Sequence, residues 1–478
     1  MSSQRAFLPL AAGLVLLAAA ASAAPPRPDF TNLPAYIRAL NQSRDLQAVA
    51  IRQEIADGPA GLARQRAATE AAGIPLDLRQ AQPPVPPDRN AALLWEKWDA
   101  LRRGHVRLPN YAETLSAGYA YTPEQLARVQ QVFDENREAM DILRQAAEKP
   151  ALAFPDEDFL HYAGLREAAR ELKTESYLLA TQGRYADAVA DQALGFGIAK
   201  QIASRPTLIN YLVGNAIEAI TLGSMKDILY LAGPNAAVDA QVQQTIPAAR
   251  PVLSLKRALT GEVSYSLAQI EKMRSASPAE LASLAQAATD PSGNPPQVKI
   301  KTFTPEERRF VNNLLDAVEA EYLSQMRRLV SAADAPGPAR RAVFASVQAT
   351  FPDPTNPVHT LNPTTQWNQI LLPVFGRMDE NDNRLHAQEQ VTMAGAALLA
   401  EKGRTGAFPA ALPGDFLDPF TGKPLGYRRE GDNGFVVYSV GPDGKFNGGR
   451  PGEYIFPLQA FFRYPGPTPK PVPTDMLK

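Results

Sequence analysis

Apolar residues recur along most of this chain at steps of three and four residues, the spacing that gives a helix one apolar face. The pattern is clearest between residues 156 and 231, where it predicts three consecutive helices. The first covers 156–181, the second ends near Arg205, and Pro206 opens the third. The apolar positions of the third are Leu208, Ile209, Leu212, Val213, Ile217, Ile220 and Leu222. We therefore expect stacked helices that each bury one stripe.

Short cap motifs mark where further helices begin. Thr122-Pro-Glu-Gln, Ser277-Pro-Ala-Glu and Thr304-Pro-Glu-Glu each combine a hydroxyl cap, a proline in the first turn and an acidic residue against the positive end of the helix dipole. Together with the apolar spacing, they predict helices at 33–56, from 90 onward, and at 122–148, 253–275, 277–288, 304–332 and 379–402.

The turn between the first two of the three consecutive helices resembles the hinge of a tetratricopeptide repeat. Gly183 and Tyr185 stand at the positions of that hinge, whereas Gln192 replaces its usual aromatic residue. A repeat array needs several copies to bury its core, and a second copy is not evident. A general helical hairpin is therefore the preferred interpretation.

The period changes near the end of the chain, where Leu425 and Tyr427 alternate as strand residues do. The turn 430–434 follows, and the β-branched and aromatic segment 435–440 is expected to pair back as a hairpin. Residues 454–456 are expected to add a third strand. The predicted fold is mostly α: a helical-hairpin bundle or solenoid-like body with a small C-terminal α+β module built on an antiparallel hairpin.

Proline, with 43 residues, is nearly twice as frequent as the usual ~5 %, and its clusters separate the predicted segments. These segments are a signal peptide at 1–23, an N-terminal helix and proline-rich linker at 24–88, a helical body at 89–378, a helix plus β module at 379–462, and a proline-rich tail at 463–478.

The N-terminus has the pattern of an export signal. Arg5 precedes an apolar run from Ala6 to Ala21, and Ala21-Ser-Ala23 offers the small residues that signal peptidase recognises. The run is short for a membrane span of about 20 residues, so cleavage after Ala23 is the preferred prediction and retention as an anchor the alternative. No later segment is apolar enough to span a bilayer, so we expect no stable membrane insertion after cleavage.

The amino-acid composition limits the cell compartments and the kinds of catalytic chemistry that are expected for this protein. The 478 residues include no cysteine, which excludes thiol catalysis, zinc–cysteine sites and iron–sulfur clusters. Many bacterial periplasmic proteins lack disulfides, so a periplasmic or secreted bacterial protein is expected. The net charge of −1 provides no field that would recruit nucleic acid.

Motifs of catalysis or cofactor binding are not found in the sequence. The four histidines, His105, His161, His359 and His386, lack the spacing of a zinc site. Glu218 lies in an apolar helical segment and Glu262 follows Gly261 at a helix bend. Paired carboxylates could act as acid and base, but a role as hydrogen-bonded core or rim residues is preferred. The acidic residues Asp379, Glu380 and Asp382 are interpreted as complements to a helix dipole. We therefore predict no catalytic and no cofactor-binding residue.

One segment resembles a known module. The motifs Asp418-Pro-Phe-Thr-Gly-Lys-Pro-Leu-Gly-Tyr427, Tyr438-Ser-Val-Gly-Pro-Asp-Gly444 and Gly448-Gly449 resemble, in order and spacing, the C-terminal domain of the major pseudopilins of type II secretion. The chain lacks the pseudopilin leader and filament-forming helix, so we expect no pilus. The remainder resembles exported bacterial helical proteins of unassigned function, through Pro87-Asp-Arg-Asn90 and Arg205-Pro-Thr-Leu-Ile209.

The resemblance implies a calcium site, because pseudopilins of this kind hold calcium in the loop after this turn. Asp443 falls on a matching position, and Glu453 is the other candidate ligand. The usual later acidic pair is replaced by 450–452, and the charges of Lys445 and Arg450 oppose a cation. The alternative is that Asp443 only organises its own turn.

The expected function is that of an exported, non-catalytic binding or scaffold protein at the cell envelope, with a protein partner and no nucleic acid. One alternative is a periplasmic hydrolase that uses buried carboxylates, since such sites leave no short motif. Another is an accessory component of a secretion apparatus, which rests on the resemblance of the module alone. A buried acidic cluster in a deep pocket would favour the enzyme.

Overall fold

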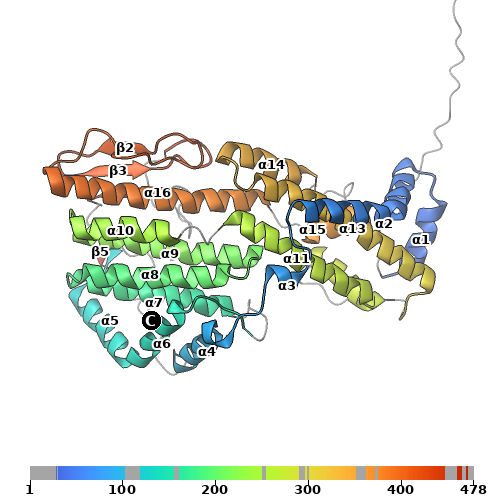
Figure 1. Ribbon diagram of the computed structural model, residues 1–478, viewed down its shortest axis with the longest axis horizontal. Coiled ribbons are helices and arrows are strands. Elements are labelled where there is room, and N and C mark those ends of the chain that lie inside the picture. Colours follow the sequence, from blue (N-terminus) through green and yellow to red (C-terminus); the bar gives the residue numbers. More distant parts are fainter. Residues whose placement is uncertain are drawn as a thin grey trace, which may run out of the picture. The chain divides into compact units, whose positions relative to one another are not determined.

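The computed structural model describes residues 28–29, 31–102, 119–154, 161–249, 254–289, 297–298, 301–350, 362–371, 375–446, 460–465 and 470–471. These residues form 16 α-helices, a three-stranded antiparallel sheet and a short parallel strand pair (Figure 1). The prediction of a mostly α fold with a small α+β module is confirmed.

The helices are α1 Leu33–Gln42, α2 Leu46–Ala71, α3 Leu78–Ala81, α4 Ala92–Arg102, α5 Pro123–Glu135, α6 Arg137–Glu148, α7 Tyr162–Thr181, α8 Tyr185–Ala203, α9 Leu208–Ala232, α10 Ala236–Ala249, α11 Leu255–Ser275, α12 Pro278–Thr289, α13 Pro305–Ala332, α14 Gly337–Ala349, α15 Pro363–Leu371 and α16 Phe375–Thr405. The strands are β1 Tyr119–Ala120, β2 Gly426–Arg429, β3 Phe435–Tyr438, β4 Phe461–Tyr464 and β5 Lys470–Pro471.

Two predicted helices are each divided in two. The segment 33–56 breaks between α1 and α2, where the Asp45 carboxylate accepts the Gln47 amide at 2.8 Å and so caps α2. The segment 122–148 breaks between α5 and α6 at Asn136, whose side-chain amide donates to the Val132 carbonyl at 2.9 Å. In both places a short polar side chain competes with the helical hydrogen bonds of the backbone.

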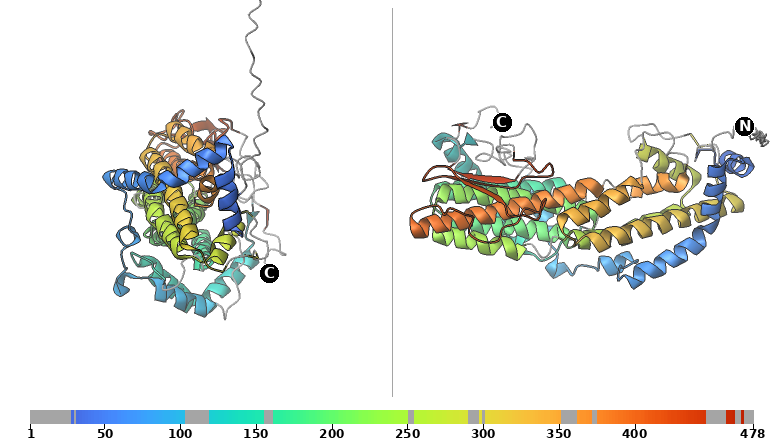
Figure 2. Two further views of the ribbon diagram at one scale, coloured as in Figure 1. Left: turned by 90° about the vertical axis from the view of Figure 1, so that its right-hand side faces the viewer. Right: turned by 90° about the horizontal axis from the view of Figure 1, so that it is seen from above.

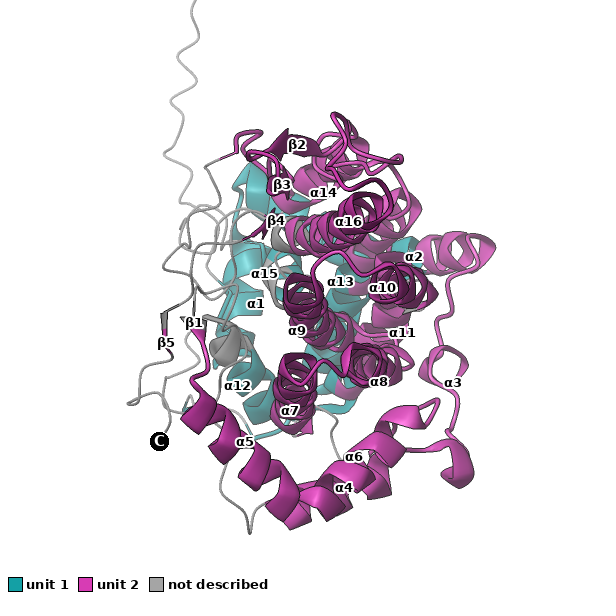
Figure 3. Cartoon of the chain, turned by 90° about the vertical axis from the view of Figure 1, so that its left-hand side faces the viewer, with its two compact units in different colours: residues 1–62, 273–318, 353–370 teal, residues 63–272, 319–352, 371–478 magenta. Residues whose placement is uncertain are grey.

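The chain divides into two compact units, each discontinuous in sequence (Figure 3). Unit 1 comprises 1–62, 273–318 and 353–370; unit 2 comprises 63–272, 319–352 and 371–478. Each segment predicted from the sequence is continuous, whereas both units combine segments that are distant along the chain. Proline clusters mark where one segment ends and the next begins, but they do not indicate which segments contact one another. The predicted signal peptide at 1–23 lies outside the described residues.

Unit 1 is held by close contacts between its helical segments. Tyr36 of α1 packs edge-on against Phe310 of α13, with ring centroids 6.2 Å apart. Arg274 and Asp316 form an ion pair at 2.6 Å. Gly58 of α2 lies so near α13 that a Cβ there would stand 2.4 Å from the Asn313 carbonyl oxygen, so a larger residue would push the helices apart.

The centre of unit 2 is the three-helix succession predicted from the apolar spacing. α7 and α8 form a hairpin whose turn uses Gly183 at φ 77°, a backbone conformation that favours glycine. The Gln192 side chain donates to the Leu172 carbonyl at 3.1 Å and the Ser176 hydroxyl at 2.5 Å, so a polar tie stands where the repeat hinge has an aromatic ring. The Thr207 hydroxyl caps α9.

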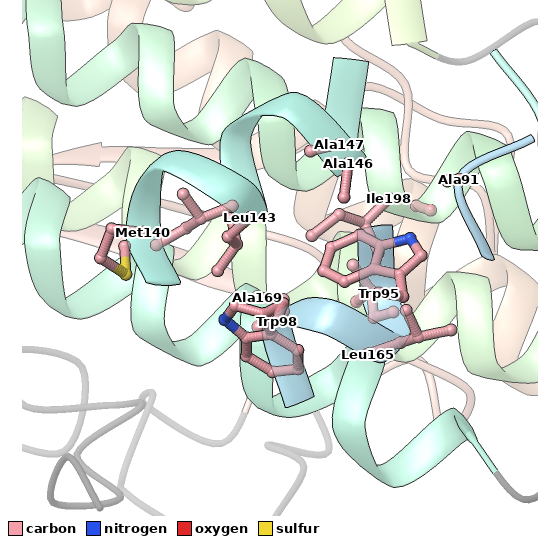
Figure 4. Packing of buried hydrophobic residues seen from close by; sticks show 14 of the residues in the cluster. Ala91, Trp95, Trp98, Met140, Leu143, Ala146, Ala147, Leu165, Ala169 and Ile198 are labelled. Carbon is pink, nitrogen blue, oxygen red and sulfur yellow. The ribbon is translucent and has the colours of Figure 1, made fainter. Parts of the chain in front are cut away.

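A hydrophobic core joins α4 and α6 to α7 and α8 (Figure 4). Trp95 and Trp98 of α4 lie edge to face, with ring centroids 5.6 Å apart, beside Leu143 of α6 and Leu165 of α7. The buried indole N–H of Trp95 donates to the Gln201 side-chain oxygen at 3.0 Å. Two large aromatic side chains thus contribute apolar area to this contact.

The C-terminal module forms the expected hairpin. β2 pairs antiparallel with β3, with Tyr427 opposite Val437, and β4 pairs with the other side of β3. The third strand that the structure describes is β4; the predicted strand at 454–456 lies outside the described residues. The sheet lies along α16 in Figures 1 and 2, and a Cβ on Gly395 of α16 would stand 2.0 Å from the Phe462 ring.

The module shares one core with the helical body of unit 2. The residues of this core come from α7 to α10, α16 and the sheet, and include Leu222, Leu229, Val391, Phe408, Phe435, Val437 and Phe462.

None of the described helices combines the length and the apolar character needed to cross a membrane.

Candidate functional site

The predicted calcium ligands do not come together in the part of the chain that the structure describes. Asp443 is exposed, and its carboxylate accepts the Lys445 amide at 3.1 Å, the contact of a side chain that organises its own turn. Glu453 lies outside the described residues. Within those residues, no group of three or more histidine or acidic side chains is arranged to hold a metal ion. Calcium binding stays a prediction.

The buried carboxylate of the module is Asp418. One of its oxygens accepts the Phe420 amide at 2.9 Å and the Ser439 hydroxyl at 3.1 Å, and the other accepts the Val440 amide at 2.8 Å. These bonds fasten the 418–422 turn to the end of β3. Asp418 therefore stabilises the fold of the module.

Glu218 and Glu262 are not brought together. The Glu262 carboxylate accepts the Leu208 amide at 2.8 Å, at the N-terminus of α9. Glu218 lies ten residues further along α9, roughly 15 Å at 1.5 Å per residue. Burial raises the pKa of Glu262, but its contact is with a helix end and not with a second acid.

Two buried ionic clusters in unit 2 contain the best-defined polar geometry. The first, the Arg340 cluster, consists of Tyr211 from α9, Arg340 from α14, and Asp379, Asp382 and Asn383 from α16. The Arg340 guanidinium lies 2.6 Å from Asp379 Oδ1 and 2.8 Å from Asp382 Oδ2, and donates to Asn383 Oδ1 at 2.8 Å. Tyr211 donates its hydroxyl to Asp382 Oδ1.

Each carboxylate oxygen of the Arg340 cluster takes part in a hydrogen bond or an ion pair; Asp382 Oδ2, which has no hydrogen bond in the described residues, has the ion pair with Arg340. Asp379 Oδ2 accepts from the Asn383 amide at 3.2 Å, and His386 Nδ1 lies 3.4 Å from Asp382 Oδ2. Burial lowers the pKa of Arg340, but the charges of Asp382 and Asp379 outweigh this and raise it above its usual value. The guanidinium is thus a fixed positive charge that joins α14 to α16, and Tyr211 extends the cluster to α9.

The second cluster, the Asp191 cluster, has too few hydrogen-bond donors for its carboxyl oxygens. It consists of Arg102 from α4, Arg144 from α6, Glu171 and Glu175 from α7, and Asp191 from α8. Arg144 Nη2 lies 2.5 Å from Glu175 Oε1 and its Nε lies 3.8 Å from Asp191 Oδ1. Arg102 Nη1 lies 3.7 Å from Glu171 Oε1. Three carboxyl groups therefore share two guanidinium groups.

Two of these carboxyl groups hold protons near neutral pH. Burial raises the pKa of Asp191 to about 8, the nearby Glu175 raises it further, and Arg144 opposes the rise only in part. Burial also raises the pKa of Glu171 to about 8 against the effect of Arg102. The Asp191 cluster can therefore take up and release protons near pH 8, which is the chemical requirement of a general acid or base.

Access to substrate is not evident at either cluster in the described residues. Two small hollows flank the segment that leads into α9, and Tyr211 lines one of them. Each has a free volume of about 10 Å³, room for roughly one water molecule.

The sequence interpretation missed the partners of these residues. Asp379 and Asp382 were expected to complement a helix dipole, but α16 begins at Phe375 and both are buried against Arg340. Their spacing places them on one face of α16, which is a usable signal of a shared contact. Nothing in the sequence indicates that Arg340, 39 residues before Asp379, completes that contact. Of the histidines, His386 touches the Arg340 cluster and His161 stacks on Phe154 at 3.7 Å.

No family model matches the chain, and no curated protein or solved structure shows significant similarity to it.

Proposed function

We propose that this protein is an exported, non-catalytic binding or scaffold protein of the bacterial cell envelope. The export pattern at 1–23 and the absence of cysteine support the compartment. The resemblance of the C-terminal motifs to the pseudopilin module supports the same location. The shared core of module and body favours a role of the module as a structural cap on the helices.

The observation that carries the proposal is the Arg340 cluster. Its buried charges bind one another and join three helices, so they hold these helices in a defined arrangement. Buried ion pairs of this kind contribute to a defined arrangement more than to net stability. A rigid helical surface is what a binding or scaffold protein presents to its partner.

A second candidate function is a hydrolase, which the Asp191 cluster favours. Its three carboxyl groups form the buried acidic set that such an enzyme needs, and two of them titrate near pH 8. A deep pocket beside them would be needed to admit a substrate.

In-cell photo-crosslinking of the full-length chain tests the main proposal. The probe would replace Leu93 of α4, whose side chain is 76 % exposed, with Glu96 of the same helix as the exposed polar control. We expect a periplasmic protein that begins at Ala24 and forms one discrete cross-linked product from position 93. Hydrolysis of an envelope polymer by the purified protein that is lost in Glu175→Gln would overturn the non-catalytic proposal in favour of the hydrolase.

A further inference from the structure

The C-terminal tail contacts the helical body of unit 2 through a strand pair that is separate from the sheet of the module. β5, Lys470–Pro471, lies parallel to β1, Tyr119–Ala120, with Lys470 opposite Tyr119 and Pro471 opposite Ala120. β1 leads into α5, and Figure 3 shows β5 beside it. The tail is thus paired with a segment from the first half of the sequence.

β1 is held firmly by the helical body. It is followed by Tyr121, which is buried and packs edge-on against Tyr177 of α7, with ring centroids 5.3 Å apart. The Thr122 hydroxyl then caps α5 by accepting the Gln125 amide at 3.3 Å, and the Gln125 side chain accepts the Thr122 amide at 2.9 Å. β1 is therefore a strand edge with a fixed position.

β5 is held much less firmly than β1. The strand has two residues, parallel pairing is slightly less stable per residue than antiparallel pairing, and the exposed Pro471 has no amide hydrogen for the ladder. The chain is anchored before β5 at Tyr464, whose ring packs against Tyr230 and Phe408 with centroids 5.9 and 6.3 Å away. The five residues 465–469, Pro-Gly-Pro-Thr-Pro, join that anchor to β5. β5 can therefore detach from β1 while Tyr464 stays in the core.

We propose that β1 is a docking edge for an extended peptide segment of the envelope partner, and that β5 is a strap that covers this edge until the partner displaces it. Main-chain hydrogen bonds to a strand edge provide affinity for an extended chain, and the direction of β5 favours a segment parallel to β1. The pairing of Pro471 shows that a proline is accepted opposite Ala120. This role rests on the proposed binding function and adds its ligand, an extended peptide that contains proline.

Disulfide trapping in the full-length chain tests the contact between the strands, because the chain has no cysteine of its own. The paired positions of the double variant Ala120→Cys/Pro471→Cys lie in neighbouring strands, roughly 4.8 Å apart and within the range of a disulfide, so we expect an intrachain cross-link. Glu124→Cys/Pro471→Cys is the matched control, with an exposed residue in the first turn of α5, and should not cross-link. Equal cross-linking of the two variants would show that β5 is not held at β1 and would overturn the proposal.

Displacement is measured with full-length Ala120→Cys and a synthetic peptide of residues 466–478 that carries cysteine at position 471. In a redox buffer that keeps thiol–disulfide exchange at equilibrium, capture should be half-maximal near about 1 mM peptide, the order of the effective concentration of a strand on a short linker. The control is the same peptide with methylated backbone amides at positions 470 and 472, which removes hydrogens that a ladder needs. Equal capture of both peptides would overturn the docking edge.

A last comparison separates this role from the proposed function. Photo-cross-linking from a probe at Glu124, with the protein added to cell-envelope extract, should give much less partner product from the disulfide-locked Ala120→Cys/Pro471→Cys variant than from the same variant after reduction. Equal yields from the locked and reduced forms would overturn the role of β5, whether or not position 93 gives its product. Trapping of the peptide without a product at position 93 would instead count against the proposed function.

Discussion

The Arg340 cluster and the Asp191 cluster both bury carboxyl groups between helices of unit 2, yet they differ in their supply of donors. Asp379 and Asp382 receive hydrogen bonds or ion pairs from Arg340, Asn383 and Tyr211 on all of their oxygens. Asp191 shares one partly exposed guanidinium with Glu175, and one oxygen of each is left without a donor. Asp382 Oδ2 also has no hydrogen bond in the described residues, but it lies 2.8 Å from the Arg340 guanidinium, whereas Asp191 lies 3.8 Å from Arg144. The distance to a cation, and not burial alone, therefore separates the two clusters.

A helical body can therefore contain buried charges that stay fixed and buried carboxyl groups that change their protonation near neutral pH. A buried carboxylate that is fully bonded keeps its charge and acts as a structural tie. A buried carboxyl group with too few donors keeps a proton instead, and its contact then depends on pH. Four predictions test this comparison.

Arg340→Met should have the largest effect, because it leaves the charges of Asp379 and Asp382 buried without a cation. We expect a loss of about 3–5 kcal/mol of unfolding free energy, measured by urea denaturation. Arg341→Met is the matched control: its side chain is 41 % exposed and lies 3.6 Å from the same Asp379. A loss below about 1 kcal/mol for Arg340→Met would show that the cluster is not a structural tie.

Glu171→Gln should change how stability depends on pH. In the wild type, burial raises the pKa of Glu171 from its ordinary value of 4.5 to about 8, so the folded state binds the proton more tightly than the unfolded state does. Its contribution is present in full below pH 4.5 and is lost as pH rises to about 8, by at most about 1.4 kcal/mol per pH unit. The variant should lose this slope in denaturation curves at pH 5, 6.5 and 8; an unchanged slope would contradict the assignment.

Arg144→Met should cost less than Arg340→Met, because Asp191, whose pKa burial already raises to about 8, can hold a proton when its cation is removed. We expect a loss of about 1–3 kcal/mol at pH 6, by the same denaturation assay, and a larger loss at pH 8. Arg137→Met on the same helix, with a side chain 75 % exposed, serves as the control. Equal losses for Arg144→Met and Arg340→Met would remove the distinction between the clusters.

Asp443→Asn should have the smallest effect, less than about 0.5 kcal/mol, because the residue is exposed and its main contact is one amide of its own turn. Thermal unfolding with calcium and with a chelator is the measurement. A rise of Tm with calcium in the wild type that disappears in Asp443→Asn would show that this surface carboxylate binds the ion.

The local elements were predictable because their signals are local. The Gly183 turn, the Thr122 cap and the pairing of β2 with β3 each depend on a few neighbouring residues. The helix breaks at Asp45 and Asn136 were not predicted. In a sequence with helical apolar spacing, a polar residue that ends or caps a helix cannot be told apart from a polar residue on the exposed face.

The candidate site was predictable only in part. The acidic residues of α16 were visible as a group, but their burial depends on Arg340, which comes from a different helix. Glu171 and Asp191 look like ordinary surface residues of two helices, and the burial that raises their pKa values arises only when neighbouring helices pack over them. For Glu218 and Glu262 the sequence suggested a pair of carboxylates that the structure does not contain, because the two residues are far apart.

Periodicity, caps and turns act over a few residues, so they were enough to predict the class of the fold, the succession α7–α8–α9 and the hairpin of the C-terminal module. The sequence also predicts export through a segment that needs no fold to be recognised. Only the tertiary structure decided which charges meet, that the module shares its core with the helical body, and that one acidic cluster lacks donors. Those outcomes depend on contacts between residues distant in the chain, and burial then sets the protonation of each group.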